Sequence, residues 1–217
     1  IRIEDTDIER NKREAIKSIL NGLEWLNIKA DRKIIFQSEN IKNHLNFAES
    51  LICKGIAYKC FDENERLKTF KKKNIKFRSK WRNVNEKHHP KNKKFTIRLK
   101  IPDNYEIKIN DLVQGKVVVN SNEVDDYILV RSNRMPTFLL ASVVDDISMG
   151  VTDIIRGDDH LTNTFRQFFL YKMSETKLPN FAHIPLILNE KGEKLSKRDN
   201  VPSLLDFKRK GYLSQAI

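Results

Sequence analysis

Residues 192–200 bring together groups that could bind a polyphosphate. The segment reads Gly-Glu-Lys-Leu-Ser-Lys-Arg-Asp-Asn and follows an apolar run. Its two lysines, Lys194 and Lys197, flank Ser196, and ammonium groups in this arrangement can neutralise the charge that develops on a leaving pyrophosphate. A solvated basic loop is the simpler interpretation of so short a pattern. Other parts of the chain must therefore decide between the two.

Positive charge is concentrated in one stretch of the chain. The formal net charge is +12, and residues 68–100 hold fourteen Lys or Arg against one acid, Glu86, so the rest of the chain sums to −1. A clustered surplus of this kind indicates a polyanionic partner such as a nucleic acid. Phe70, Phe77 and Trp81 interrupt the basic run. These rings could stack on bases or form the core of a small domain.

The first part of the chain alternates helices and strands. Apolar residues spaced three, four and seven apart predict a helix over 6–27, with Asp7 as its N-cap. A strand over 34–36 and a helix over 41–52 follow, and Gly55 can end that helix in a left-handed conformation. This order is typical of a nucleotide-binding parallel sheet.

The pattern then changes to one of short alternating segments. Residues 95–101, 105–109 and 112–119 have this character, with a turn at Gln114-Gly115. Alternation of apolar and polar residues predicts antiparallel strands. We therefore expect an inserted α+β domain over about 57–123 that carries the basic run.

Short apolar runs predict that the parallel sheet resumes afterwards. The predicted strands cover 127–130, 137–144, 153–155 and 184–188. A helix is expected after Gly157, with Asp158 or Asp159 as its N-cap and a buried stripe made of Leu161, Phe165, Phe168 and Phe169. The last strand would deliver the loop 192–200 to the sheet edge at which doubly wound folds bind nucleotides.

Several motifs, taken in order along the chain, resemble those of the glutamyl-tRNA synthetases, a family of class I aminoacyl-tRNA synthetases. Residues 194–198, Lys-Leu-Ser-Lys-Arg, resemble the KMSKS loop of that class, and residues 2–7, Arg-Ile-Glu-Asp-Thr-Asp, resemble a signature of the family. The remaining matches are 144–146, 155–161, 163–164 and 166–167. The resemblance covers nearly the whole chain and is weakest over about 64–94.

The resemblance implies an α/β fold in which a Rossmann-like doubly wound parallel sheet is interrupted by an inserted α+β domain that binds the tRNA acceptor end. The catalytic domain would occupy 1–56, without its first strand, and 124–188. The insertion would occupy 57–123, and 189–217 would hold the KMSKS-type loop and the start of a helical region. We expect a fragment that lacks elements at both ends and that does not form the adenylate by itself.

The resemblance also assigns roles to individual residues. Lys194 and Lys197 would be catalytic, within an ATP-binding set made of Lys194, Leu195, Ser196, Lys197, Arg198 and Asp159. The glutamate-binding set would be Glu4, Phe138, Ser142, Arg156 and His160. The tRNA-binding set would be Lys71, Lys72, Lys73, Lys76 and Arg78.

Two of these assignments have structural alternatives. Arg156 would hold the glutamate side-chain carboxylate through its guanidinium fork, and it could equally form an ion pair with Asp158 or Asp159. Glu4 would receive the α-ammonium group of the substrate. It could instead cap the following helix together with Asp5.

Two positions depart from the family pattern. Phe138 stands where a tyrosine hydroxyl usually helps to bind the amino acid, which removes a hydrogen bond worth roughly 0.5–1.5 kcal/mol, or up to about 3 kcal/mol with a charged partner. Asn133 and Arg134 stand where a polar residue and a glycine usually form a turn. Arg134 must therefore adopt a strained conformation, or the loop must change shape.

The sequence does not predict a zinc site. Some bacterial members of the family carry one in the insertion, but here Cys60 is what remains of the usual cysteine pair, with Asp62 where a second ligand could stand. His88, His89 and one thiol do not supply a tetrahedral set. We interpret Cys53 and Cys60 as reduced thiols.

The resemblance implies a glutamate–tRNA ligase that uses ATP and Mg²⁺, forms glutamyl-adenylate and transfers glutamate to tRNA(Glu), with tRNA(Gln) as a second candidate partner. Three alternatives stay open: a shortened relative that glutamylates a modified tRNA base, a glutaminyl-tRNA synthetase, and a decayed paralogue that only binds RNA. The sequence has no apparent signal peptide or membrane-spanning run, and 32% of its residues are charged. We expect a cytoplasmic protein without membrane contact that is a monomer at full length.

Overall fold

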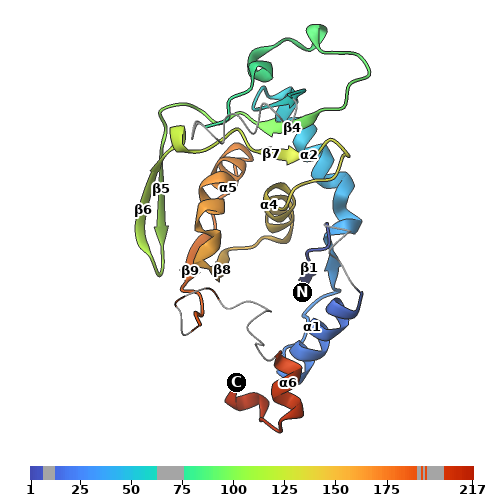
Figure 1. Cartoon of the computed structure of the whole chain (residues 1–217), viewed down its shortest axis with the longest axis vertical. Coiled ribbons are helices and arrows are strands. Elements are labelled where there is room, and N and C mark those ends of the chain that lie inside the picture. Colours follow the sequence, from blue (N-terminus) through green and yellow to red (C-terminus); the bar gives the residue numbers. More distant parts are fainter. Residues whose placement is uncertain (7–12, 63–75, 190–191, 193, 195–202) are drawn as a thin grey trace. The chain divides into compact units, whose positions relative to one another are not determined.

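The computed structural model describes residues 1–6, 13–62, 76–189, 192, 194 and 203–217 (Figure 1). The chain divides into two compact units, residues 1–39 with 186–217, and residues 40–185. Each unit contains strands and helices of its own. Several residues that the sequence singles out lie outside the described ranges: Asp7, Phe70, Lys71, Lys72, Lys73, Leu195, Ser196, Lys197 and Arg198.

The first unit contains a two-stranded parallel sheet. β1 (Arg2–Ile3) pairs with β2 (Ile35–Phe36), which confirms the strand predicted over 34–36. The Ile35 amide donates to the Ile1 carbonyl (3.0 Å), and the Ser38 amide donates to the Asp5 carboxylate (2.8 Å). Asp5 therefore fastens the carboxyl end of β1 to the chain that follows β2.

Helices α1 (Arg13–Trp25) and α6 (Leu204–Arg209) pack on each other in this unit. α1 confirms the predicted helix within the described residues. Gly22 lies so close to Leu204 that an added Cβ would stand 3.4 Å from that side chain, so the absence of a side chain at Gly22 lets the two helices approach. α6 begins with a capping box, because the Ser203 hydroxyl accepts from the Asp206 amide and the Asp206 carboxylate accepts from the Ser203 amide.

The second unit holds two sheets. The first is antiparallel and has the order β3 (Ala57–Cys60), β4 (Thr96–Leu99) and β7 (Ile128–Val130). The second has the order β6 (Gly115–Asn120), β5 (Glu106–Asp111), β9 (Asn180–Ile184) and β8 (Asp153–Gly157). β5 and β6 form the predicted hairpin, while β5, β9 and β8 run parallel. This mixture of parallel strands and helices confirms the α/β class.

The β5–β6 hairpin and the strands after it share one sheet. Asp111, the last residue of β5, pairs with Phe181 of β9. Hydrogen bonds thus connect the segment 106–120 directly to the strands that carry Arg156 and His183. The insertion over 57–123 stays a prediction.

Two predicted strands are wrong. The segment 137–144 belongs instead to helix α4 (Phe138–Met149), which ends at Gly150 with a φ of 67°. Residues 140–146 are all buried, so this helix has no exposed face to give it a helical period, and its apolar residues resemble those of a central strand. The strand predicted over 184–188 is β9, which ends before Pro185 because proline has no amide hydrogen to donate to a sheet.

The helix after Gly157 begins later than predicted. A 3₁₀ turn, η5 (Asp158–His160), precedes α5 (Leu161–Met173). The N-cap position of α5 belongs to His160, without a side-chain hydrogen bond, rather than to Asp158 or Asp159. The predicted stripe is confirmed, since its four residues are buried or half-buried and pack in the core: Leu161, Phe165, Phe168 and Phe169.

The core of the second unit lies between its helices and sheets. α2 (Ile41–Cys53) contacts α4 and β3, and α4 contacts α5, as Figure 1 shows. Gly55 follows α2 with a φ of 70°, as predicted. Large, fully buried side chains from α2, α4, α5, β4, β5, β7 and β9 form one continuous core: Leu51, Ile97, Leu99, Ile107, Ile109, Leu129, Leu140, Phe169, Leu170 and Phe181.

Arg134 adopts the strained conformation that its sequence position predicts. Its φ is 64°, a region that favours glycine, and its guanidinium forms an exposed ion pair with Glu49 (2.9 Å). An exposed pair of this kind contributes at most about 1 kcal/mol. The turn that leads into α4 is therefore held mainly by its backbone, through the Arg134 amide to the Arg131 carbonyl (2.9 Å).

A buried carboxylate organises the region around the antiparallel sheet. Asp126 is 0% exposed and accepts hydrogen bonds from the Tyr58 hydroxyl and the Ile101 amide, both at 3.0 Å. Guanidinium nitrogens of Arg78 and Arg82 lie 3.5 Å from its two oxygens. Burial raises the pKa of Asp126, while the Ile101 amide and the two arginines act in the opposite direction. Burial, and then Asp126 itself, also raise the pKa of Tyr58 well above its usual range.

The basic run divides by residue type. Its described arginines face the protein: Arg78 and Arg82 approach Asp126, and Arg98, which is 5% exposed, donates to the Asp126 carbonyl (2.6 Å) and lies over the Phe77 ring (4.3 Å). Its described lysines are half-buried at Lys100 and exposed elsewhere, at Lys76, Lys80, Lys87, Lys91, Lys93 and Lys94. The arginines therefore stabilise the fold, and the lysines make up the exposed charge.

Removing the Asp126 carboxylate should destabilise the protein far more than removing an exposed carboxylate beside the same arginines. We expect Asp126→Ala to lower the free energy of unfolding by about 3–5 kcal/mol, because it removes the buried member of the ion pairs with Arg78 and Arg82 and leaves the buried Tyr58 hydroxyl and Ile101 amide without their acceptor. Asp103→Ala is the matched control, since Asp103 contacts Arg78 and Arg82 at 3.5 and 3.4 Å but its side chain is 58% exposed. We expect that change to cost at most about 1 kcal/mol. Urea denaturation measures both, and equal losses would contradict the role of Asp126.

Candidate active site

Four of the five predicted glutamate-binding residues lie in the second unit, and contacts link them. Phe138 and Ser142 are one turn apart on α4, and the Ser142 hydroxyl donates to the Phe138 carbonyl (2.8 Å). The Phe138 ring lies 5.8 Å from the His160 ring, centroid to centroid. The Ser142 oxygen also accepts from the Gln167 amide (2.7 Å), and Gln167 in turn binds Arg156. Helices α4 and α5 and the end of strand β8 thus bring these residues together.

Arg156 is held by side chains from β9 and α5. Its Nε donates to His183 Nε2 (3.1 Å), and its Nη2 donates to Thr164 Oγ1 (2.6 Å) and Gln167 Oε1 (3.0 Å). The guanidinium carbon lies 5.8 Å from the centroid of the Phe181 ring. These bonds fix the direction of the guanidinium. Such a group can bind a carboxylate by charge-assisted hydrogen bonds.

A buried Asp–His pair lies behind Arg156. Asp111 Oδ2 is 2.6 Å from His183 Nδ1, and both side chains are 0% exposed. Asp111 Oδ1 accepts from the backbone amides of Val113 (3.0 Å), Gln114 (2.9 Å) and His183 (3.1 Å). Burial acts to raise the pKa of the Asp111 carboxyl, but these amides and the His183 ring outweigh it and lower the pKa to about 2.

The residues that hold Arg156 were not predicted from the sequence as site residues. Thr164 and Gln167 lie in the matched motif segments 163–164 and 166–167, but the motif carried no role for them. Asp111 and His183 are 72 positions apart, and neither is flanked by a local pattern that would single it out. The pairing of β5 with β9 is what brings them together.

The predicted residues of the first unit form separate local contacts. Glu4 accepts from Arg2 (2.9 Å), and Asp5 binds the Ser38 hydroxyl (2.5 Å) as well as its amide. Lys194 is exposed and pairs with Leu188 across a turn in which Gly192 has a φ of 75°. A glycine suits this position, because other residues rarely adopt such a φ. In the second unit, the predicted ATP-binding residue Asp159 is exposed on η5.

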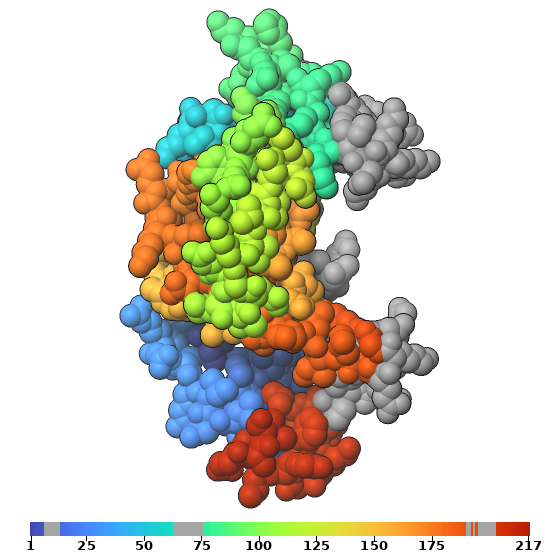
Figure 2. Space-filling view, turned by 90° about the vertical axis from the view of Figure 1, so that its left-hand side faces the viewer, coloured from blue at the N-terminus to red at the C-terminus, as the bar shows by residue number. Residues whose placement is uncertain are grey.

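The two described residues of the predicted tRNA-binding set differ in their surroundings. Lys76 is exposed, whereas Arg78 donates to the Val124 carbonyl (2.7 Å) and approaches Asp126. Figure 2 shows the segment with the exposed lysines, coloured teal to green, projecting from the rest of the second unit. A projecting surface with several ammonium groups suits a phosphate backbone.

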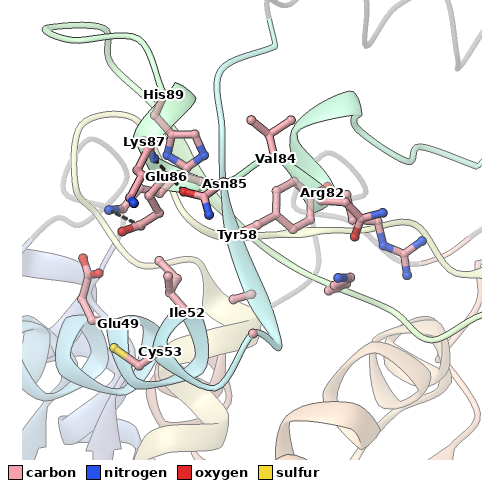
Figure 3. Close-up of a pocket in the computed structure, with 15 residues that line it drawn as sticks. Glu49, Ile52, Cys53, Tyr58, Arg82, Val84, Asn85, Glu86, Lys87 and His89 are labelled. Carbon is pink, nitrogen blue, oxygen red and sulfur yellow. Dashed lines mark hydrogen bonds and ion pairs between the residues drawn. The ribbon is translucent and has the colours of Figure 1, made fainter.

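A groove of about 750 Å³ lies between α2, β3 and the segment 82–89 (Figure 3). Glu49 and Cys53 border it from α2, and Lys87 and His89 border it from the opposite side. Lys59 and Glu86 form an ion pair on its wall (2.7 Å). Of the predicted glutamate-binding and ATP-binding residues that the structure describes, none lines this groove.

The surroundings of Cys60 are polar but do not form a metal cluster. Its thiol lies 3.7 Å from Asp62 Oδ2 and 3.5 Å from Ser79 Oγ, and Ser79 donates to Asp62. Within the described ranges, no group of three or more His, Cys, Asp or Glu side chains could hold a metal ion. In the same part of the chain, no helix has the length and apolar character needed to cross a membrane.

The sequence model of one known family, described as "tRNA synthetases class I (E and Q), catalytic domain", matches residues 1–217. This chain belongs to that family. Class I tRNA synthetases use ATP, and their catalytic domain has a Rossmann-like fold, which agrees with the parallel strands of β5, β9 and β8.

Curated relatives of this class I synthetase chain carry the name glutamate–tRNA ligase. It is 43% identical to glutamate–tRNA ligase 2 of Wolbachia pipientis subsp. Culex pipiens over 220 residues, and 45% identical to glutamate–tRNA ligase 1 of Acidiphilium cryptum over 223 residues. Both alignments include 100% of this chain and 48% of the relative. The chain therefore spans about half the length of the curated relatives that it matches.

Solved structures of glutamate–tRNA ligases have the same fold. One from Elizabethkingia meningosepticum, in complex with its amino acid, has a TM-score of 0.84 and 29% identity over 99% of this chain and 51% of its own. One from Elizabethkingia anophelis has a TM-score of 0.79 and 30% identity over 97% of this chain and 46% of its own.

The low pKa of Asp111 predicts how this class I synthetase chain responds to acid. A carboxyl whose pKa is lower in the folded protein than in the unfolded chain stabilises the fold above the unfolded value, near 3.9, and this stabilisation is lost as the pH falls toward about 2. We expect the difference in urea midpoint between wild type and Asp111→Asn to be constant from about pH 7 to 5 and to shrink below about pH 4. A difference that grows with acid would contradict the prediction. Asp103→Asn, at an exposed site, controls for the loss of a charge.

Proposed function

We propose that the protein to which this chain belongs is a glutamate–tRNA ligase. The observation that carries the proposal is the Arg156 guanidinium, which is held by Thr164, Gln167 and His183 and is linked through Gln167 to Ser142, in a chain whose relatives bear that name. A fixed cation next to aromatic side chains suits a small substrate with a carboxylate on its side chain. The relatives' names do not favour the base-modifying or RNA-binding alternatives.

The reaction that we propose has two steps. An oxygen of the glutamate α-carboxylate attacks the α-phosphorus of ATP, which forms the mixed anhydride and releases pyrophosphate. The 2′-hydroxyl of the terminal adenosine of tRNA then attacks the activated carbonyl carbon, which forms the ester and releases AMP. Both steps need positioning and stabilisation of charge more than a covalent nucleophile on the protein.

In this proposal Arg156 binds the side-chain carboxylate and Glu4 receives the α-ammonium group of glutamate. Phe138 and His160 flank the substrate with their rings, and Ser142 acts through Gln167 because its hydroxyl already bonds to Gln167 and to the Phe138 carbonyl. The absence of a tyrosine hydroxyl at Phe138 leaves Arg156 with a larger share of substrate recognition.

The proposed ATP-binding set includes the KMSKS-type loop. Lys194 and Lys197 stabilise the charge on the leaving pyrophosphate, supported by Leu195, Ser196, Arg198 and Asp159. The exposed ammonium group of Lys194, after the turn at Gly192, fits a group that approaches phosphates from solvent. Mg²⁺ would supply further neutralisation of the phosphates when bound with ATP, and we propose no zinc.

The proposed tRNA surface consists of lysines of the inserted domain 57–123. It includes Lys71, Lys72, Lys73 and Lys76, together with the exposed lysines at 80–94, while Arg78 supports the fold through Asp126. The partner is tRNA(Glu), with tRNA(Gln) as a second substrate to be tested. We further propose a cytoplasmic protein that acts as a monomer.

Removing the Arg156 guanidinium tests the proposal directly. In the full-length protein, Arg156→Ala should raise the KM for glutamate by on the order of 100-fold or more, change the KM for ATP and tRNA little, and erode the preference for glutamate over glutamine. ATP–pyrophosphate exchange in the presence of tRNA measures all of these. Arg134→Ala is the control, because it removes an exposed arginine of the same unit. Equal losses with glutamate and glutamine would show that Arg156 only supports the fold.

Neutralising the basic surface tests the tRNA partner. Replacing Lys71, Lys72 and Lys73 by Ala should weaken tRNA binding and reduce the slope of log K against log salt by up to roughly two to three. Replacing Lys29, Lys33 and Lys54, which are exposed outside the basic run, removes the same charge and should leave that slope nearly unchanged. Identical slopes for the two triple variants would contradict the assignment of this surface.

A further inference from the structure

The hydrogen bonds around His183 determine which of its ring nitrogens carries a proton. Arg156 Nε–H can only donate, and it lies 3.1 Å from His183 Nε2, so Nε2 must be the acceptor. An imidazolium would place two N–H donors against each other. His183 is therefore neutral, with its proton on Nδ1, where it donates to Asp111 Oδ2 at 2.6 Å.

Asp111 is oriented so that it can impose this tautomer. Its Oδ1 is occupied by the three backbone amides of Val113, Gln114 and His183, which leaves Oδ2 to face the His183 ring. A carboxylate can only accept, so Nδ1 must be the donor. Both side chains are 0% exposed, so water does not compete for these bonds.

We infer that Asp111 and His183 are positioning residues for amino-acid selection: Asp111 fixes the His183 tautomer, and the lone pair on His183 Nε2, which also lies 3.0 Å from Thr164 Oγ1, aims the Arg156 guanidinium at the substrate's side-chain carboxylate. This inference rests on the proposed role of Arg156. The Asp111 carboxylate and the guanidinium bind the two different nitrogens of one imidazole ring, so the proton on that ring links Asp111 to Arg156. The two residues act through Arg156 and do not themselves need to touch glutamate.

The substitution Asp111→Asn separates this role from a purely structural one. Three amide donors keep the Asn carbonyl oxygen at the Oδ1 position, so the amide NH₂ faces His183 Nδ1 and the ring proton must move to Nε2. Arg156 Nε–H then meets an N–H donor in place of a lone pair. The shape of the side chain hardly changes, whereas the tautomer reverses.

In the full-length enzyme, we expect Asp111→Asn to raise the KM for glutamate by about tenfold to a hundredfold, with the KM for ATP and for tRNA changed little. In the ¹⁵N spectrum, the signal of His183 Nδ1 should move from the shift of a protonated ring nitrogen to that of an unprotonated one. The signal of Nε2 should move in the opposite direction. Asp153→Asn is the matched control, because Asp153 begins β8, on the same pair of strands, and is exposed. It should leave both readouts as in wild type.

A double variant gives a second test, in which His183 is replaced by a residue that has no tautomers. Glutamine at position 183 can turn its amide oxygen toward Arg156 whatever Asp111 carries, so Asp111→Asn should raise the KM for glutamate much less in the His183→Gln background than in wild type. An equal rise in both backgrounds, or equal rises in the KM for glutamate and ATP, would overturn the inference.

The outcome distinguishes the inference from the proposed function. If Arg156→Ala raises the KM for glutamate while Asp111→Asn reverses the ¹⁵N pattern and leaves that KM unchanged, the positioning role is overturned and the proposed function stands. If Arg156→Ala itself leaves the KM unchanged, the role of Arg156 is overturned and the inference with it.

Discussion

The cost of burying an unpaired charge is the constraint on which the second unit depends. Asp111, Asp126 and Asp145 are all at most 5% exposed. Each one is held by donors from elements far away in the sequence: Asp111 binds His183, Asp126 binds Tyr58, and Asp145 binds His44 at 2.8 Å. Because an isolated buried carboxylate costs several kcal/mol, these pairs favour one arrangement of strands and helices over others that leave the charges unpaired.

The same constraint separates cations that support the fold from cations that can bind partners. Arg78, Arg82 and Arg98 contact Asp126 or its carbonyl, where planar guanidinium groups form several hydrogen bonds at once. The described lysines of the basic run, apart from Lys100, are instead exposed to solvent, which suits strongly hydrated ammonium groups. Arg156 differs from both sets, since Thr164, Gln167 and His183 orient its guanidinium.

Much of the fold could be predicted from the sequence, and the misses have physical causes. The β5–β6 hairpin was predicted because its alternation is a local property, with Ile107 and Ile109 buried and the residues between them exposed. The first part of helix α4 was predicted as a strand, because residues 140–146 are all buried and a helix without an exposed face shows no clear helical period in its sequence. Arg98 belongs to the polar face of an alternating segment, yet it is buried because Asp126 and Phe77 give it partners that lie outside that segment.

The sequence by itself determined the family, the predicted site residues and the location of the positive charge, because motifs, spacing and composition are carried by the order of residues. The tertiary structure decided which side chains hold Arg156, that arginines and lysines of one basic run have different roles, and that His183 carries its proton on Nδ1. These facts depend on Asp111 and His183, 72 positions apart, meeting where β5 pairs with β9. A hydrogen bond depends on distance and direction in space, and residue order leaves both undetermined until the strands pair.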